Sequence, residues 1–127
     1  MELTLDHIHI RCHDLEAAVD YYVKVLGGEV EKRTSVPGMP IVRVRLGGQT
    51  IALSPKRQEM EVESLSGAPR WGVWQLAYRV DDIQAVYQEL KARGAKFKGE
   101  PVEQVPGLTV AFVEAPDGVE IELLQFS

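Results

Sequence analysis

The chain repeats a sequence pattern, and this repeat limits its fold more than any other feature. Residues 7–15, HIHIRCHDL, align with residues 75–83, QLAYRVDDI, at an offset of 68 positions. Residues 48–53, GQTIAL, align with residues 118–123, GVEIEL, at an offset of 70. A repeat of this period indicates two copies of one supersecondary unit packed against each other.

The repeat predicts a single domain, residues 1–127, built from two modules. The modules cover about residues 1–64 and 70–127, and a chain of 127 residues is long enough for one domain with a core. Small and turn-forming residues lie between the modules and are typical of a linker: Ser64, Ser66, Gly67 and Pro69.

Hydrophobic periodicity predicts the same element order in both modules. Each begins with an alternating strand, continues through an aspartate N-cap (Asp14 or Asp82) into an amphipathic helix, and ends in three strands. The order is β-α-β-β-β twice, an α+β fold. In the first module we expect strands at 3–11, 29–35, 41–46 and 49–54 and a helix at 15–26. In the second we expect strands at 74–80, 96–103, 108–114 and 119–126 and a helix at 83–93.

Alternation along each strand separates a core face from an open face. Ile8, Ile10 and Cys12 form an apolar row that packs on the helix, so Cys12 is core and not a nucleophile. A two-residue turn at Gly47-Gly48 pairs Arg45 with Thr50, Val44 with Ile51 and Arg43 with Ala52. The open face then has an unusual set of polar residues: His7, His9, Arg11, Arg43, Arg45, Gln75, Arg79, Glu120 and Glu122. The alternative interpretation is the solvated outer face of an antiparallel sheet, which is commonly polar.

Charge and composition exclude several classes of protein. The chain has 14 Lys+Arg and 19 Asp+Glu, a formal net charge of −5, and it lacks the basic stripe that binds nucleic acid. No apolar run is long enough to span a membrane, and the N-terminus does not resemble a secretory signal. The single cysteine favours a reducing compartment, so we expect a cytoplasmic protein.

The motifs of both modules resemble those of the vicinal oxygen chelate superfamily, which includes glyoxalase I, methylmalonyl-CoA epimerase, extradiol dioxygenases and bleomycin-binding proteins. The resemblance rests on LDHIHI at 5–10, DLEAAVDYY at 14–22, VLGG at 25–28, QLAYRVDDI at 75–83 and PDGVEIEL at 116–123. It covers nearly the whole chain and implies a glyoxalase-like fold, in which two βαβββ modules form curved mixed sheets around a cleft. It also implies a homodimer.

In metal-dependent members, the resemblance implies four ligand positions, one on the first and one on the last strand of each module. His7, Gln75 and Glu122 fall on three of them, and Ala52 falls on the fourth, where glyoxalase-type members have Glu. The resemblance therefore implies a divalent transition metal (Zn, Ni, Co, Fe or Mn) held by His7, Gln75 and Glu122. Gln is a weaker ligand than His, and Arg43 beside Ala52 opposes cation binding unless an anion intervenes.

Three functions stay open at this point. The first is a metal-dependent lyase or isomerase that stabilises an enolate or oxyanion of a small anionic metabolite, with Glu122 as ligand and base. In this hypothesis the substrate is bound by His9, Arg43, Arg45 and Arg79. The second is a non-catalytic protein that sequesters a small molecule, favoured by Ala52 and Gln75. The third is a dioxygenase or transferase of the same superfamily.

Two tryptophans begin the second module. Trp71 and Trp74 are more typical of a core or an interface than of a substrate platform. We expect them to anchor packing.

Overall fold

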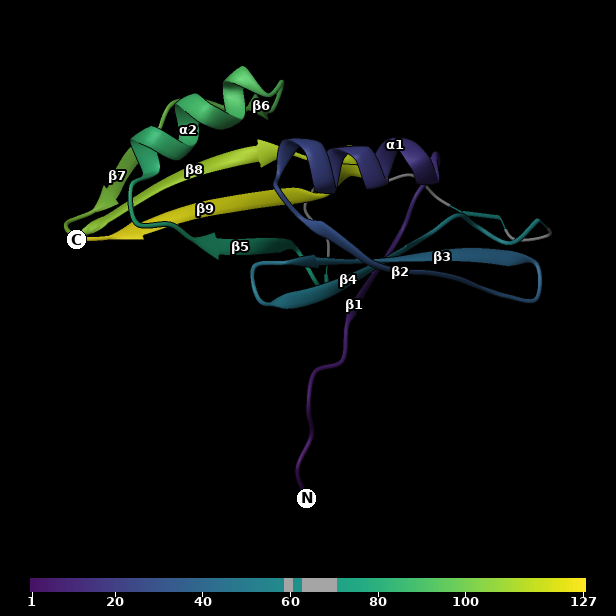
Figure 1. Ribbon diagram of the computed structural model, residues 1–127. Coiled ribbons are helices and arrows are strands. Elements are labelled where there is room, and N and C mark those ends of the chain that lie inside the picture. The colour runs from purple at the N-terminus through teal and green to yellow at the C-terminus, as the bar shows by residue number, and fades with distance from the viewer. Residues whose placement is uncertain (59–60, 63–70) are drawn as a thin grey trace. The chain divides into compact units, whose positions relative to one another are not determined.

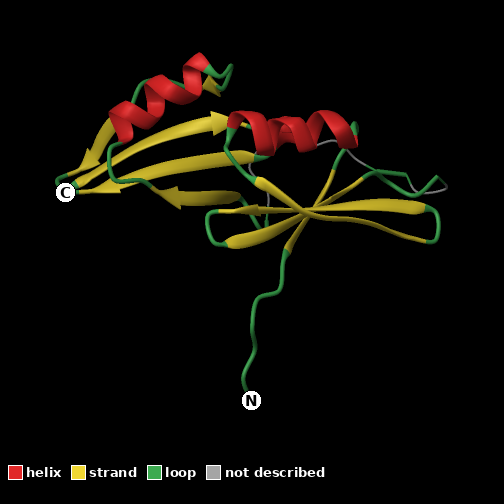
Figure 2. Ribbon diagram, in the orientation of Figure 1, coloured by secondary structure: helices red, strands yellow, loops and turns green. Residues whose placement is uncertain are grey.

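The computed structural model describes residues 1–58, 61–62 and 71–127, and its chain divides into two compact units, Met1–Glu63 and Ser64–Ser127. Each unit is a mixed sheet with helical structure on one face (Figures 1 and 2). The predicted linker residues Ser64, Ser66, Gly67 and Pro69 lie outside the described residues. No helix among the described residues is long and apolar enough to cross a membrane.

Unit 1 has a four-stranded sheet in the order β1-β4-β3-β2. β1 runs parallel to β4, whereas β3 pairs antiparallel with β4 and with β2. Its elements are β1 (Ile8–Arg11), α1 (Leu15–Asp20) continued by the π-helical η1 (Tyr21–Val25), β2 (Glu29–Val36), β3 (Met39–Leu46) and β4 (Gln49–Ser54).

The first strand is shorter than predicted, because β1 begins at Ile8 and not at residue 3. Its neighbour is β4, and Ile8 pairs with Ile51 in parallel register. β4 itself begins at Gln49, directly after the turn at Gly47 and Gly48. Residues 3–5 would therefore face the turn and not a strand, which leaves them without a ladder to join.

The helix of unit 1 begins and ends near the predicted residues. The Asp14 side chain accepts a hydrogen bond from the Ala17 N–H at 3.0 Å, which confirms the predicted N-cap. The last turn widens, because Leu26 N–H donates to Tyr21 O at 3.1 Å, five residues back. Ala18, Val19 and Tyr22 are buried in the core of the unit with the sheet residues Val42, Val44, Ile51 and Leu53.

Unit 2 has a five-stranded sheet in which β5, β9, β8 and β6 are neighbours in that order and β7 also pairs with β8. β5 runs parallel to β9, as β1 does to β4. Its elements are β5 (Gln75–Arg79), α2 (Ile83–Ala92), β6 (Lys96–Phe97), β7 (Val102–Val105), β8 (Leu108–Glu114), the 3-10 turn η2 (Pro116–Gly118) and β9 (Glu120–Phe126).

One predicted strand of unit 2, residues 96–103, is divided into β6 and β7. Pro101 lies between them and has no N–H to donate to a ladder, so the strand cannot continue through it. The helix agrees with the prediction: Asp82 caps α2 by accepting from the Ala85 N–H at 3.0 Å. Ile83, Tyr87 and Leu90 of α2 are buried in the core with the sheet residues Val113, Ile121 and Leu123.

Candidate functional site

The open face of unit 1 is the face of its sheet opposite α1, and its register is the predicted one. Arg45 pairs with Thr50, Val44 with Ile51 and Arg43 with Ala52. Gly47 and Gly48 form this turn with φ of 62° and 81°, values that glycine adopts without strain. On the β1 side, Ala52 pairs with His9, so three strands present one row across the open face: His9, Ala52 and Arg43.

Asp6 joins two of the predicted site residues. Its Oδ2 lies 2.7 Å from His7 Nδ1 and accepts a hydrogen bond from Arg43 Nη2 at 3.2 Å. These two hydrogen bonds, that of His7 first, hold the pKa of the Asp6 carboxyl below its usual value. Asp6 is therefore ionised at neutral pH and is in contact with one candidate metal ligand and one candidate substrate-binding residue.

His9 contacts a buried hydroxyl on the neighbouring strand. Its Nε2 lies 2.7 Å from Ser54 Oγ, and Ser54 is 1% exposed. The His7 and His9 rings meet edge to face, with centroids 5.8 Å apart. Burial, followed by the charges of His7 and Arg11, lowers the pKa of His9. His9 is consequently a mainly neutral imidazole at pH 7, fixed by Ser54 on the open face.

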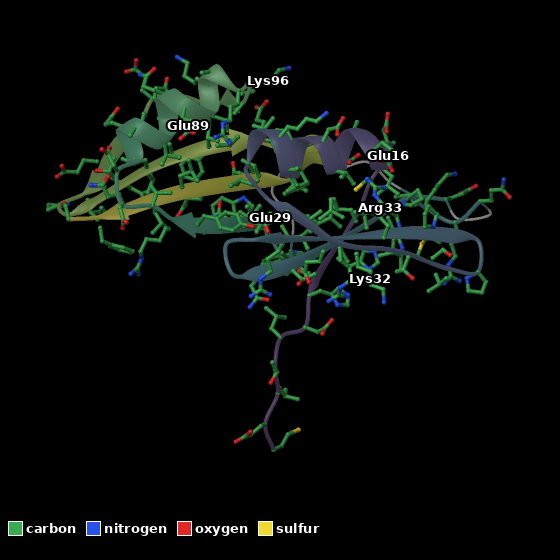
Figure 3. The ribbon with its side chains drawn as sticks, viewed as in Figure 1. Glu16, Glu29, Lys32, Arg33, Glu89 and Lys96 are labelled. Carbon is green, nitrogen blue, oxygen red and sulfur yellow. The ribbon has the colours of Figure 1, made fainter. Side chains whose placement is uncertain are left out.

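The edge strand β2 adds Lys32 to the open face of unit 1. A bulge between Val30 and Lys32 lets Arg33 face Val42 while Lys32 faces Arg43. In Figure 3, Arg33 and Glu16 accordingly lie on the helix side of the sheet and Lys32 on the opposite side. Arg45, which pairs with Glu29, is exposed.

The open face of unit 2 contains the other two candidate ligands in direct contact. Gln75 Nε2 donates to Glu122 Oε2 at 3.1 Å, and both side chains are half-buried. Within the described residues, Gln75 Oε1 is buried without a hydrogen-bond donor. One face of β5 and β9 thus presents an amide oxygen and a carboxylate that can each accept further hydrogen bonds or bind a cation.

Glu120 adds a second carboxylate to this face. It is the Cα partner of Gln75 in the parallel ladder, and its Oε1 accepts from Lys98 Nζ at 2.5 Å. Its Oε2 is buried and, among the described residues, has no donor. The sequence placed Glu120 on the open face, but nothing in it indicated the contact with Lys98.

Arg79 lies farther along β5. Its guanidinium is 4.8 Å from the centroid of the Phe126 ring, a cation–π contact with the last residue of β9. Arg79 therefore has a contact of its own at the opposite end of the strand from Gln75. Among the described residues, no three His, Cys, Asp or Glu side chains form a group able to hold an ion.

Three residues outside the site test the sequence interpretation further. Cys12 is 3% exposed, which confirms it as a core residue. Trp71 and Trp74 are 99% and 64% exposed. Of the two expected locations, a core or an interface, the structure therefore rules out the core.

Sequence reasoning did not identify Asp6 or Ser54 as site residues. Ser54 lies two residues after Ala52 on β4, so alternation places it on the open face near His9. Asp6 directly precedes His7, but its contact with Arg43 joins residues 37 positions apart. The first signal was available in the register, whereas the second required the three-dimensional structure.

Two mixed sheets, each with its helix between the first and second strands, define the class of the protein as one with the glyoxalase fold. A glyoxalase family protein from Enterococcus faecalis superposes with a TM-score of 0.80 at 25% identity, over 95% of this chain and 96% of that one. The family model of the Glyoxalase/Bleomycin resistance protein/Dioxygenase superfamily matches residues 4–123. The chain belongs to this superfamily.

Two curated relatives show the range of activities among similar proteins. A probable lactoylglutathione lyase of Synechocystis sp. is 30% identical over 95% of this chain and 94% of its own length. The ethylmalonyl-CoA/methylmalonyl-CoA epimerase of Cereibacter sphaeroides is 33% identical over 95% of this chain and 96% of its own length. One is named as a probable lyase and the other as an epimerase, so the family alone leaves the reaction open.

Proposed function

We propose that the protein is a metal-dependent lyase or isomerase that acts on a small, oxygenated, anionic metabolite. The observation that carries the proposal is the Gln75–Glu122 pair, in which an amide holds a carboxylate at 3.1 Å on the open face of unit 2. These residues fall on two ligand positions of the superfamily, and His7 falls on a third. Members of the superfamily generally use divalent metals.

The donor atoms of these three residues fit a divalent transition metal. His7 has its Nδ1 on Asp6, which leaves Nε2 as an electron-pair donor. Gln75 Oε1 is buried without a donor among the described residues, and Glu122 has a second carboxylate oxygen. Zn²⁺, Ni²⁺, Co²⁺, Fe²⁺ and Mn²⁺ accept such nitrogen and oxygen ligands. A bound ion would polarise a substrate carbonyl as a Lewis acid.

Protein side chains supply the rest of the proposed chemistry. Glu122 removes a proton from the carbon next to the substrate carbonyl, and the Gln75 amide keeps its carboxylate oriented. Arg43 and Arg45 attract the anionic group of the substrate, and His9 donates or accepts a hydrogen bond as a neutral imidazole. Arg79 binds a more distant part of the substrate from its position over Phe126.

Two substrate classes follow from the names of the relatives, and one experiment tests both. The protein is incubated with a thiol adduct of a 2-oxoaldehyde or with a 2-alkylmalonyl thioester in deuterated water. We expect exchange or isomerisation that stops on chelation and returns with added metal. Glu122→Gln should lower the rate at least about 100-fold, whereas Glu103→Gln, an exposed position on β7, should not. Undiminished turnover after exhaustive chelation would overturn the metal dependence.

A second function, small-molecule binding without catalysis, is favoured by one observation. Position 52 is alanine, and the residues paired with it from the two neighbouring strands are His9 and Arg43. Arg43 in this row attracts an anion, and the alanine at position 52 supplies no ligand for a cation. Thermal shift of the metal-free protein against carboxylates and phosphates distinguishes the two functions. A strongly stabilising ligand that is recovered chemically unchanged favours binding.

We also propose that the protein is a homodimer located in the cytoplasm. β2 is exposed along its whole length and is an edge strand of its sheet, and such edges favour pairing between chains. Light scattering during size-exclusion chromatography measures the mass directly. A monomer at micromolar concentration would overturn the dimer, and fractionation of the native cells tests the compartment.

A further inference from the structure

We propose that Asp6 is the positioning residue of His7: it fixes the imidazole in the tautomer whose Nε2 is free to bind a metal ion. The inference rests on the proposed metal-binding function. It starts from two contacts of one carboxylate oxygen, 2.7 Å to His7 Nδ1 and 3.2 Å to Arg43 Nη2. No sequence motif assigns Asp6 a role in the site.

The first contact determines the tautomer of His7. A neutral imidazole has one N–H and one bare nitrogen, and an ionised carboxylate can only accept a hydrogen bond. The nitrogen 2.7 Å from Asp6 Oδ2 must therefore carry the proton, so Nδ1 is the donor. Nε2 then has the lone pair that a metal ion requires, and a carboxylate on the other nitrogen also raises the basicity of the ligand.

The second contact concerns the charge beside His7. Arg43 donates to the same Asp6 oxygen that His7 contacts, and a cation opposes the binding of a metal ion to a neighbouring ligand. Asp6 accepts from the guanidinium and from the imidazole with the same oxygen, so one negative charge offsets the arginine and orients the histidine.

Within the described residues, the contacts of the Asp6 side chain are those with His7 and Arg43, and neither of them caps a helix. Its side chain is 75% exposed and it precedes β1, outside any helix or strand. By contrast, Asp14 and Asp82 cap helices through hydrogen bonds to backbone N–H groups. Loss of the Asp6 carboxylate should therefore change His7 and leave the fold intact.

The test measures tautomers in the metal-free protein by ¹⁵N–¹H correlation of labelled histidines at pH 8. In the parent, His7 should show the Nδ1–H pattern. Asp6→Ala should move His7 toward the Nε2–H tautomer, and Asp6→Asn, whose amide oxygen still accepts, should retain part of the Nδ1–H form. His9, held by Ser54, is an internal reference. Asp81→Asn is the control, since Asp81 is exposed and lies in the other unit.

Zn²⁺ affinity provides the second measurement, by competition with a chromophoric chelator. We expect Asp6→Ala to weaken Zn²⁺ binding about 10–100-fold, the loss typical of an outer-shell partner of a metal-bound histidine. Asp81→Asn should bind as the parent does. Thermal unfolding of each variant verifies that the fold is unchanged.

The two measurements separate the failure of this inference from the failure of the proposed function. A His7 tautomer that is the same in Asp6→Ala and the parent overturns the positioning role, as does unchanged Zn²⁺ affinity in a parent that binds the ion. A parent that does not bind Zn²⁺ or the other transition metals overturns the proposed function, whereas the tautomer comparison still decides whether Asp6 orients His7.

Discussion

Gly28 lies where the described structure leaves almost no room for a side chain, and Gly28→Ala is a sharp test of how unit 1 is packed. A Cβ there would lie 2.8 Å from Tyr22 O, 2.8 Å from Val44 Cγ1 and 3.2 Å from Arg45 O. Tyr22 and Val44 are 1% and 0% exposed, so neither can move into solvent. The chain leaves the helix at this point and passes close to β3.

The cost can be estimated from these contacts. Overpacking a filled core typically costs about 1–3 kcal/mol. Alanine recovers about 0.4–1 kcal/mol because it restricts the unfolded chain. We therefore expect a net loss of about 1–2 kcal/mol in the free energy of unfolding, which at about 4 °C per kcal/mol lowers Tm by about 4–8 °C. The added Cβ would displace Val44 and Arg45 of β3. Because β3 also contains Arg43, anion binding to unit 1 should weaken as well.

Chemical denaturation of Gly28→Ala against the parent measures the loss. Gly99→Ala is the matched control, because a Cβ at Gly99 meets no atom within 4 Å and its φ is not positive. We expect the control to be as stable as the parent or more stable by up to about 1 kcal/mol. A Gly28→Ala variant as stable as the Gly99→Ala variant would refute the packing described for this turn.

Three further predictions concern His9, a surface ion pair and a half-buried phenol. Ser54→Ala removes the partner of His9 Nε2 and should cost about 1 kcal/mol; the ¹⁵N spectrum of His9 should change, and an unchanged spectrum would contradict the contact. Arg33 and Glu16 form two hydrogen bonds, 3.0 and 3.1 Å, between β2 and α1; a double-mutant cycle should give a small favourable coupling that falls with salt, whereas additive losses would contradict it. Burial raises the pKa of Tyr21 to about 12. The unfolded state then loses this proton first, so stability should fall as pH rises from about 10 to 12, by less than the full ~1.4 kcal/mol per pH unit because the phenol is only half-buried. Tyr21→Phe should flatten this slope in pH-dependent denaturation, and an equal slope in both proteins would contradict the assignment.

Local signals in the sequence were sufficient to predict the hairpin of β3 and β4 residue by residue. Two consecutive glycines define a turn of fixed length, and once the turn is fixed, alternation determines every pair from Leu46 and Gln49 onward. The same holds for the helix starts, where an aspartate precedes an amphipathic segment and caps it.

The parts that sequence could not predict depend on contacts between segments distant in the chain. In the register that pairs Ile8 with Ile51, residues 3–5 lie beside the turn before β4 and not beside a strand, whatever their own alternation. Similarly, the sequence pattern places Arg79 and Arg43 on an open face in the same way. In the structure, Arg79 lies over Phe126, whereas Arg43 binds Asp6. A polar pattern identifies the face of a sheet, but it does not identify the partner of each charge.

The two halves of the repeat have the same ladder with different side chains, and this difference explains the contact of Asp6. In unit 1 the row is His9, Ala52 and Arg43; at the corresponding positions of unit 2 it is Ala77, Glu122 and Phe112. Unit 2 thus has a carboxylate on its central strand between an alanine and an aromatic ring. Unit 1 has an arginine and a mainly neutral imidazole beside an alanine, so that row contains the Arg43 cation without an anion.

Asp6 supplies the missing anion from outside the ladder. A glutamate at position 52 would face both His9 and Arg43; with alanine there, the Arg43 guanidinium contacts Asp6 at 3.2 Å instead. Because the same oxygen accepts from His7, the balance of charge in unit 1 and the orientation of its candidate ligand depend on one exposed residue. Ala52→Glu should therefore compete with Asp6 for Arg43, and in that variant the Zn²⁺ affinity should depend less on Asp6 than in the parent. A loss on Asp6→Ala that is as large in the Ala52→Glu background as in the parent would contradict this coupling.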